Sequence, residues 1–294
     1  MRTPDFFIVG APKCGTTSLA AWLGAHPDVF MSPVKEPHFF SVDLDIRNRP
    51  ARSAAEYATL FESATARYAA VGEASVSYLY SHAAAPAIAA AYPGARFIVC
   101  VRNPVEMALS LHGQALLSGN EDLVSFADAW EAQAARRDGH RIPARCRAPW
   151  PLQYDAVCRV GEQLDRRQRI VGRDAVCTVL LDDLDADPRT SYRAVLRFLG
   201  VRDDARAEFP ALNPASVPRY PWLHAAIGRV RAARRASGLP PLGIPWLTSI
   251  DRFNRRVAPR APLPAAERAR LRANFAEDVQ RLGTLLGKDL SRWT

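Results

Sequence analysis

The sequence lacks any long hydrophobic run. No stretch of its 294 residues reaches the 18 or more apolar residues that a membrane-spanning helix requires. The apolar run near the start, FFIV, meets glycine at Gly10 and is too short for a secretory signal. We therefore expect a cytoplasmic protein without a membrane span.

Patterned cysteine and histidine are also missing. The five cysteines are odd in number, scattered, and free of CxxC spacing, which argues against a disulfide framework and a zinc site. The six histidines show neither HxxxH nor HExxH spacing. The sequence therefore predicts a reduced protein with no metal site.

Internal repeats are absent, and so is a clean linker. No period of 20 to 50 residues recurs, which excludes a solenoid. A hydrophobic fraction of 48% argues against disorder. Prolines become dense only between Pro210 and Pro264, a region that we expect to be irregular with one or two short basic helices. We predict a single domain over residues 1–294.

Three apolar runs predict buried strands, at residues 6–10, 95–102 and 175–184. Continuous rather than alternating apolar strands indicate a parallel sheet covered on both faces. Helical patterns separate them, which predicts an α/β fold with a central, mostly parallel sheet flanked by helices. The expected helices lie at residues 16–26, 56–63, 81–92, 105–117, 124–137, 155–168 and 264–287.

The charge balance is basic, with a formal net charge of +9. An arginine-rich composition explains this charge, and so does a polyanionic ligand, because positive charge concentrates anions near a surface. The net charge alone would also suit a nucleic-acid-binding protein, but such a protein is expected to have aromatic residues among its basic ones. The arginine cluster at 229–235, RVRAARR, has none.

A loop with glycines, a lysine and three hydroxyls follows the first predicted strand. The segment from Gly10 to Ser18, GAPKCGTTS, lies between that strand and a helix. Backbone N–H groups at a helix start bind anions, and Lys13 adds a cation. The loop is not a Walker A motif, because no Gly-Lys-Ser/Thr follows. An ordinary strand-to-helix turn with an incidental lysine remains the alternative.

A second candidate anion site follows the strand at 95–102. Arg102 ends that strand, and Pro104 suits the first turn of the helix that carries Ser110. Arginine binds phosphate through its planar fork. The two sites together describe a ligand with two separated phosphates. A kinase or NTPase with a divergent phosphate loop is the alternative enzyme, but it would want an acidic residue where Arg102 stands.

Four ordered motifs resemble the sulfotransferase family, and most closely its heparan-sulfate-type and bacterial branch. They are FFIVGAPKCGTTSL, VKEPHFFS, VGEASVSYLYS and FIVCVRNPVEMALSLH. The tail from Ala269 to Trp293 is similar to that branch as well. The resemblance implies a P-loop-like strand-loop-helix and transfer of a sulfuryl group from 3′-phosphoadenosine-5′-phosphosulfate, with 3′-phosphoadenosine-5′-phosphate as product.

The resemblance also implies which residues bind the donor. The 5′-phosphosulfate loop would comprise Lys13, Cys14, Gly15, Thr16, Thr17 and Ser18. Arg102 and Ser110 would hold the 3′-phosphate. Arg256 and Arg260 lie where the family closes a loop over the nucleotide.

Catalytic residues are implied in the same way. Glu36 takes the position of the family's general base, with His38 beside it, and Lys13 would stabilise charge on the leaving phosphate. We expect burial near Phe39 and Phe40 to raise the pKa of Glu36 and so strengthen it as a base. Outside the resemblance, Glu36 could simply pair with Lys35, and His38 could be a packed histidine.

The acceptor is a small molecule or a sugar in this interpretation, with a natural product as one candidate. Glu73, Ser75 and Tyr78 are the candidate acceptor residues, although Glu73 could equally cap its strand. Ser41 replaces an aspartate that is frequent in the heparan sulfate enzymes, and Cys158 and Val160 replace a glycine and a tyrosine. These departures weaken the case for a polysaccharide acceptor.

Overall fold

The computed structural model describes residues 2–47, 49–210, 216–218, 255–257 and 263–294. Its centre is a five-stranded sheet with the strand order β2-β3-β1-β4-β5, in which every pair is parallel. The strands are β1 (Phe6–Gly10), β2 (Val29–Met31), β3 (Ala70–Ala74), β4 (Arg96–Val101) and β5 (Val176–Leu180). The predicted α/β fold with a parallel sheet is confirmed.

The central strands are buried along their length. All five residues of β1 are buried, and so are all of β4 except Arg96. Phe7 of β1 stacks on Phe97 of β4 with ring centroids 6.1 Å apart. Helices on both faces exclude water from such a strand, which is why its sequence reads as a continuous apolar run.

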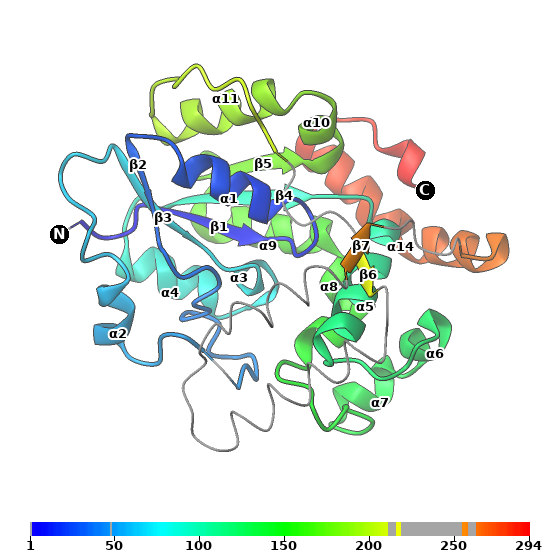
Figure 1. The fold of residues 1–294 in the computed structure, drawn as a ribbon. Coiled ribbons are helices and arrows are strands. Elements are labelled where there is room, and N and C mark those ends of the chain that lie inside the picture. The colour runs from blue at the N-terminus through cyan, green and yellow to red at the C-terminus, as the bar shows by residue number, and fades with distance from the viewer. Residues whose placement is uncertain (1, 48, 211–215, 219–254, 258–262) are drawn as a thin grey trace.

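Helices cover the two faces of the sheet. Figure 1 shows α1 (Thr16–Gly24) and α11 (Pro188–Leu199) on one side, and α3 (Ser77–Tyr80) and α4 (Ala84–Ala91) on the other. On the second side α9 (Val160–Val171) contacts α3, α4 and the last long helix, α14 (Ala265–Leu286). The other helices of the described residues are α2 (Ala54–Thr59), α5 (Pro104–Ser118), α6 (Phe126–Glu131), α7 (Gln133–Arg137), α8 (Tyr154–Cys158), α10 (Leu181–Ala186), η1 (Trp150–Leu152) and η2 (Ser291–Trp293).

Local signals place several helix ends where the sequence predicts them. The Asn103 side chain accepts hydrogen bonds from the N–H groups of Val105 and Glu106, and Pro104 is the first residue of α5. Gly287 ends α14 with a φ of 62°, in the left-handed region that glycine adopts at low cost.

Three predicted elements differ from those observed. The strand predicted at 175–184 ends at Leu180, because Leu181 begins α10. The helix predicted over 124–137 is divided at Ala132 into α6 and α7, and that over 155–168 is divided at Arg159 into α8 and α9. Strands β2 and β3 were not among the three predicted strands. Apolar periodicity alone does not register such breaks.

The proline-dense region contributes little to the described structure. Two short strands, β6 (Ser216–Pro218) and β7 (Arg255–Val257), pair in antiparallel fashion, and β6 contacts α5. The arginine cluster at 229–235 and Arg260 lie outside the described residues. No helix within the described ranges has the length and apolarity needed to cross a bilayer.

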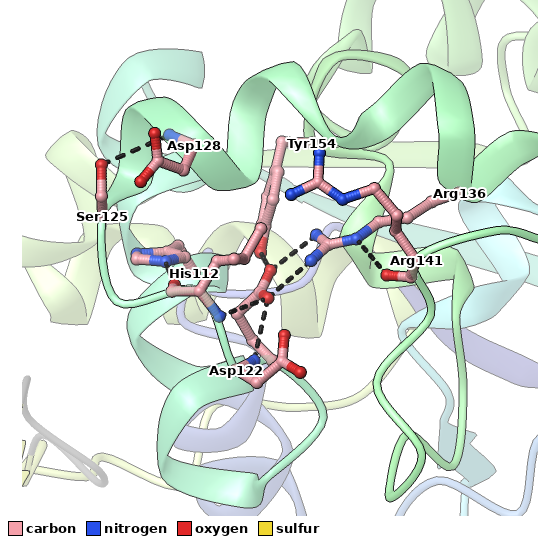
Figure 2. A network of polar contacts seen from close by, with 9 residues as sticks. His112, Asp122, Ser125, Asp128, Arg136, Arg141 and Tyr154 are labelled. Carbon is pink, nitrogen blue, oxygen red and sulfur yellow. Dashed lines mark hydrogen bonds and ion pairs between the residues drawn. The ribbon is translucent and has the colours of Figure 1, made fainter.

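A buried ion pair fixes the segment that follows α5. Arg136 of α7 donates two hydrogen bonds of 2.6 Å to the Glu121 carboxylate, and Tyr154 donates a third of 2.8 Å (Figure 2). Both charged side chains have no exposed surface. Burial alone would raise the pKa of Glu121, but the charge and hydrogen bonds of Arg136, together with hydrogen bonds from the Leu123 N–H and Tyr154, outweigh it and lower that pKa. The network ties the segment that follows α5 to α7 and α8.

Candidate active site at the carboxyl edge of the sheet

The candidate residues come from four neighbouring strands. Segments that follow β2, β1 and β4 carry Glu36, Lys13 and Arg102, and Glu73 lies in β3. Because the strands are parallel, their carboxyl ends lie along the same edge of the sheet. In open α/β folds ligands bind at this edge, near the point where the strand order reverses. Here the reversal falls at β1, which pairs with β3 on one side and β4 on the other.

The loop after β1 has a geometry suited to an anion. Gly15 precedes α1 with a φ of 86°, and no side chain caps the start of this helix. A Cβ at Gly15 would lie 3.0 Å from Leu181 Cδ1 and 3.1 Å from Leu184 Cδ2, so both the conformation and the packing require glycine. The uncapped helix start presents backbone donors and the positive end of the helix dipole. These features fit a phosphate or sulfate group.

Lys13 and Arg102 lie together at this loop. The guanidinium of Arg102 is 3.4 Å from the carbonyl oxygen of Lys13, to which it donates. The Lys13 ammonium donates to Gln114 Oε1 over 3.3 Å, and Lys13 has a φ of 64°. Gln114 lies one turn beyond Ser110 on α5, so one helix faces both candidate anion sites. Gln114 was not among the predicted site residues, although its i, i+4 spacing from Ser110 indicates the same helix face.

The other predicted loop residues divide by burial. Thr16 and Ser18 are buried in α1, and Ser110 is buried in α5. Cys14 is fully buried, and burial raises the pKa of its thiol to about 12. Its side chain is therefore a packing element, and its contribution to a ligand would come from the backbone. Arg256 belongs to β7, which pairs with β6, the strand that contacts α5.

Glu36 is paired on two sides. Lys35 Nζ lies 2.6 Å from Glu36 Oε1, and His38 Nε2 lies 3.5 Å from Glu36 Oε2. Burial alone would raise the pKa of Glu36, but the hydrogen bond with His38 and the Lys35 ammonium lower it to about 2. The expected net rise in this pKa is therefore wrong, because His38 and Lys35 together outweigh the effect of burial. Glu36 is ionised at neutral pH, as a proton acceptor must be.

The backbone around Glu36 is unusual. Glu36 and His38 have φ values of 63° and 54°. Residues other than glycine enter this region at a cost of about 1–3 kcal/mol each, and they concentrate at functional sites. The N–H of Glu36 donates to the carbonyl oxygen of Ala74 over 2.8 Å, which ties this segment to the end of β3.

The predicted acceptor residues Glu73, Ser75 and Tyr78 form a buried hydrogen-bonded group, and Ser75 contacts the backbone of His38. All three are fully buried. The hydroxyls of Ser75 and Tyr78 donate to the Glu73 carboxylate over 2.8 and 2.7 Å, and Tyr57 donates over 2.9 Å. Burial raises the pKa of Glu73, against the effect of these hydrogen bonds. Their burial favours a supporting role over direct contact with an acceptor.

A parallel α/β sheet with an uncapped, glycine-led helix start and two cations at its carboxyl edge defines a class of phosphate-binding enzyme fold. A model described as "Sulfotransferase family" matches residues 4–205. The chain therefore belongs to the sulfotransferase family.

Individual relatives agree with this assignment. The chain is 36% identical over 249 residues to heparan sulfate glucosamine 3-O-sulfotransferase 6 from Homo sapiens, which covers 83% of this chain and 66% of the relative. The Mus musculus protein of the same name is 30% identical over 249 residues, with the same coverage. This chain thus spans just under two thirds of the length of these relatives. A sulfotransferase structure from Alicyclobacillus acidocaldarius superimposes with a TM-score of 0.73 at 29% identity, covering 100% of this chain and 99% of that one.

Proposed function

We propose that this protein transfers a sulfuryl group from 3′-phosphoadenosine-5′-phosphosulfate to a hydroxyl or amine of a small molecule or sugar. The observation that best supports this proposal is that the Lys13 loop, Arg102 and Glu36 follow three strands that end at one edge of the sheet. Two cationic positions would bind the two phosphate-bearing ends of the donor. A carboxylate nearby would accept a proton.

Each residue has a chemical task in this proposal. The donor supplies a sulfuryl group on an activated phosphate, and transfer depends on positioning and charge stabilisation. Lys13 and the N–H groups of Gly15 and Thr16 would bind the 5′-phosphosulfate and stabilise charge that develops on its oxygens, with Thr17 and Ser18 as further donors. Arg102 and Ser110 would hold the 3′-phosphate, and Arg256 and Arg260 would close over the nucleotide. Glu36 would accept the acceptor's proton, with His38 beside it.

The residues from Glu36 to His38 form the segment that carries the proposed base, the base segment. A cavity of about 560 Å³, whose lining begins at Phe39 directly after this segment, suits a small acceptor. Phe39 and Phe40, which follow His38, form one wall, and Arg49 and Arg52 are also in its lining. The mixture of aromatic rings and guanidinium groups fits an acceptor with an apolar body and a negative charge. A natural product in a cytoplasmic, bacterial setting remains our preferred class, and a panel of sulfated and unsulfated acceptors assayed with labelled donor tests it.

Titration calorimetry with 3′-phosphoadenosine-5′-phosphate, without magnesium, tests the donor site. We expect one-site binding that weakens by roughly 10- to 100-fold in Lys13→Ala and in Arg102→Ala, since each loses a charge-assisted contact of about 1.5–3 kcal/mol. Lys288→Ala and Arg169→Ala are matched controls, because each removes an exposed cation from an ion pair elsewhere.

ADP and ATP separate this proposal from the kinase alternative. We expect ADP to bind more weakly, because it has no 3′-phosphate for Arg102 and Ser110. Equal binding of ATP that depends on magnesium would overturn the sulfotransferase proposal in favour of a nucleotide-dependent kinase. Unchanged affinity in both site variants would place the donor elsewhere.

A further inference from the structure

His38 is held by hydrogen bonds from the segment that follows β3. Its backbone N–H donates to Ser75 Oγ over 3.0 Å, and its ring Nδ1 lies 2.7 Å from Ser77 Oγ. Ser77 Oγ is also 2.7 Å from Ser41 Oγ. Both the backbone and one ring nitrogen of His38 are therefore fixed, and the other ring nitrogen, Nε2, faces Glu36.

Glu73 decides how the Ser75 hydroxyl is oriented. Ser75 Oγ donates to Glu73 Oε2 over 2.8 Å. A serine hydroxyl has one proton and two lone pairs. Once that proton points at Glu73, the lone pairs are available to the His38 N–H. The buried carboxylate thus makes Ser75 an acceptor at the place where the base segment needs one.

The base segment needs such support because its backbone conformation is costly. Glu36 and His38 both lie in the left-handed region. Residues persist there only where surrounding contacts over-determine the conformation. Here the contacts are the Glu36 N–H bond to Ala74 and the His38 N–H bond to Ser75.

We propose that Glu73, Ser75 and Ser77 are positioning residues for the catalytic carboxylate. They hold His38 so that its Nε2 faces Glu36, and thereby fix where the Glu36 carboxylate lies; none of them touches substrate. The proposal rests on the proposed function of Glu36 as base. It gives the buried carboxylate of Glu73 a task other than acceptor binding.

Three hydroxyl deletions test this role. Ser75→Ala and Ser77→Ala each remove a hydroxyl bonded to His38. Tyr57→Phe is the matched control: it removes a hydroxyl that donates to the same Glu73 carboxylate, while the ring that stacks on Phe39 stays. With the acceptor found in the panel, we expect kcat to fall about 10- to 100-fold in both serine variants, since small misplacements of a reacting group have effects of that size. KM for the donor should stay within about 2-fold, and Tyr57→Phe should keep kcat within about 2-fold.

The pH profile adds a readout that a purely structural role would not move. Within the part of the chain that the structure describes, the charged and titratable groups that face Glu36 are Lys35 and His38. When His38 is no longer held toward Glu36, the carboxylate loses a hydrogen bond that favours its ionised form. The acidic limb of kcat/KM should therefore move to higher pH in Ser77→Ala, and it should not move in Tyr57→Phe.

Nitrogen-15 spectra of the histidine rings test the arrangement without any turnover. The His38 signals are those absent from His38→Gln. We expect its ring resonances to shift in Ser75→Ala and Ser77→Ala and to match wild type in Tyr57→Phe. Unchanged resonances in Ser77→Ala, or a kcat loss in Tyr57→Phe as large as in the serine variants, would overturn the proposal.

If Ser75→Ala does not fold, Ser77→Ala carries both measurements. A wild-type protein that transfers no sulfuryl group to any acceptor, but whose His38 signals respond as expected, would contradict the proposed function and still support the His38 arrangement. The failures of the two proposals are therefore distinguishable.

Discussion

At the scale of single residues, the charge state of Glu36 is set by its two neighbours. The side chain is 37% exposed, and it pairs with Lys35 over 2.6 Å. Because its pKa in the folded protein lies below the ordinary 4.5, Glu36 stabilises the native state above about pH 4.5 and loses that effect as the pH falls toward 2. The same pairing makes it a weak base.

Lys35→Met should raise the pKa of Glu36 from about 2 toward 4.5, since it removes the adjacent positive charge. Titration of the side-chain carboxyl carbon by NMR measures this pKa directly. Lys288→Met is the control, because it removes a lysine from the ion pair with Asp183. A Glu36 pKa equal in the two variants would show that Lys35 does not set it.

At the scale of elements, the candidate donor-site residues on α5 depend on how this helix and its following segment are held. Helix α5 carries Ser110 and Gln114, and the residues after it are fixed by the buried pair Arg136–Glu121 (Figure 2). A buried charge whose partner is removed costs far more than an exposed one, because nothing replaces the lost hydrogen bonds.

Arg136→Met should lower the free energy of unfolding by about 3–5 kcal/mol, because it leaves the Glu121 carboxylate buried without its cation. Urea denaturation followed by circular dichroism measures the loss. Arg169→Met, in an exposed pair with Asp165, should cost no more than about 1 kcal/mol. Equal losses of unfolding free energy in the two variants would show that the buried pair stabilises the protein no more than the exposed pair does.

At the scale of the whole molecule, a helix is capped by a residue more than a hundred positions away in the sequence. Helix α9 has no side-chain cap of its own at Arg159. Asp278 of α14 supplies one: its carboxylate accepts from the N–H groups of Gly161 and Glu162, both over 2.8 Å. Burial raises the pKa of Asp278, and these two hydrogen bonds oppose the effect. These hydrogen bonds join α14 to α9, the helix that packs on the same face of the sheet as α3 and α4.

Asp278→Asn should lower the free energy of unfolding by roughly 0.5–2 kcal/mol, the usual value of a helix cap, because an amide has one acceptor oxygen for two N–H groups. Thermal unfolding with calorimetry measures it. Glu277→Gln, the neighbouring exposed acid paired with Arg281, serves as control and should change stability by less than about 0.5 kcal/mol. An Asp278→Asn variant with the same unfolding free energy as wild type would show that the packing of α9 and α14 does not depend on this cap.

The sequence by itself determined the parallel α/β architecture, the strand β1, the glycine-led loop from Gly10 to Gly15 and the start of α5 at Pro104. These depend on local physical rules: an apolar run buried on both faces, glycine where φ is positive, proline in a first helical turn. The four motifs that resemble the family are also local strings of residues. They are sufficient by themselves to indicate the sulfotransferase family.

Only the tertiary structure decided what surrounds Glu36 and why Glu73 is buried. The pKa of Glu36 follows from distances to Lys35 and His38, and the position of His38 follows from Ser75 and Ser77, which lie 37 and 39 residues further along the chain. The capping of α9 by Asp278 depends on a contact across 117 residues. Electrostatic and hydrogen-bond effects act through space over a few ångströms, so residues distant in sequence enter them only after the chain has folded.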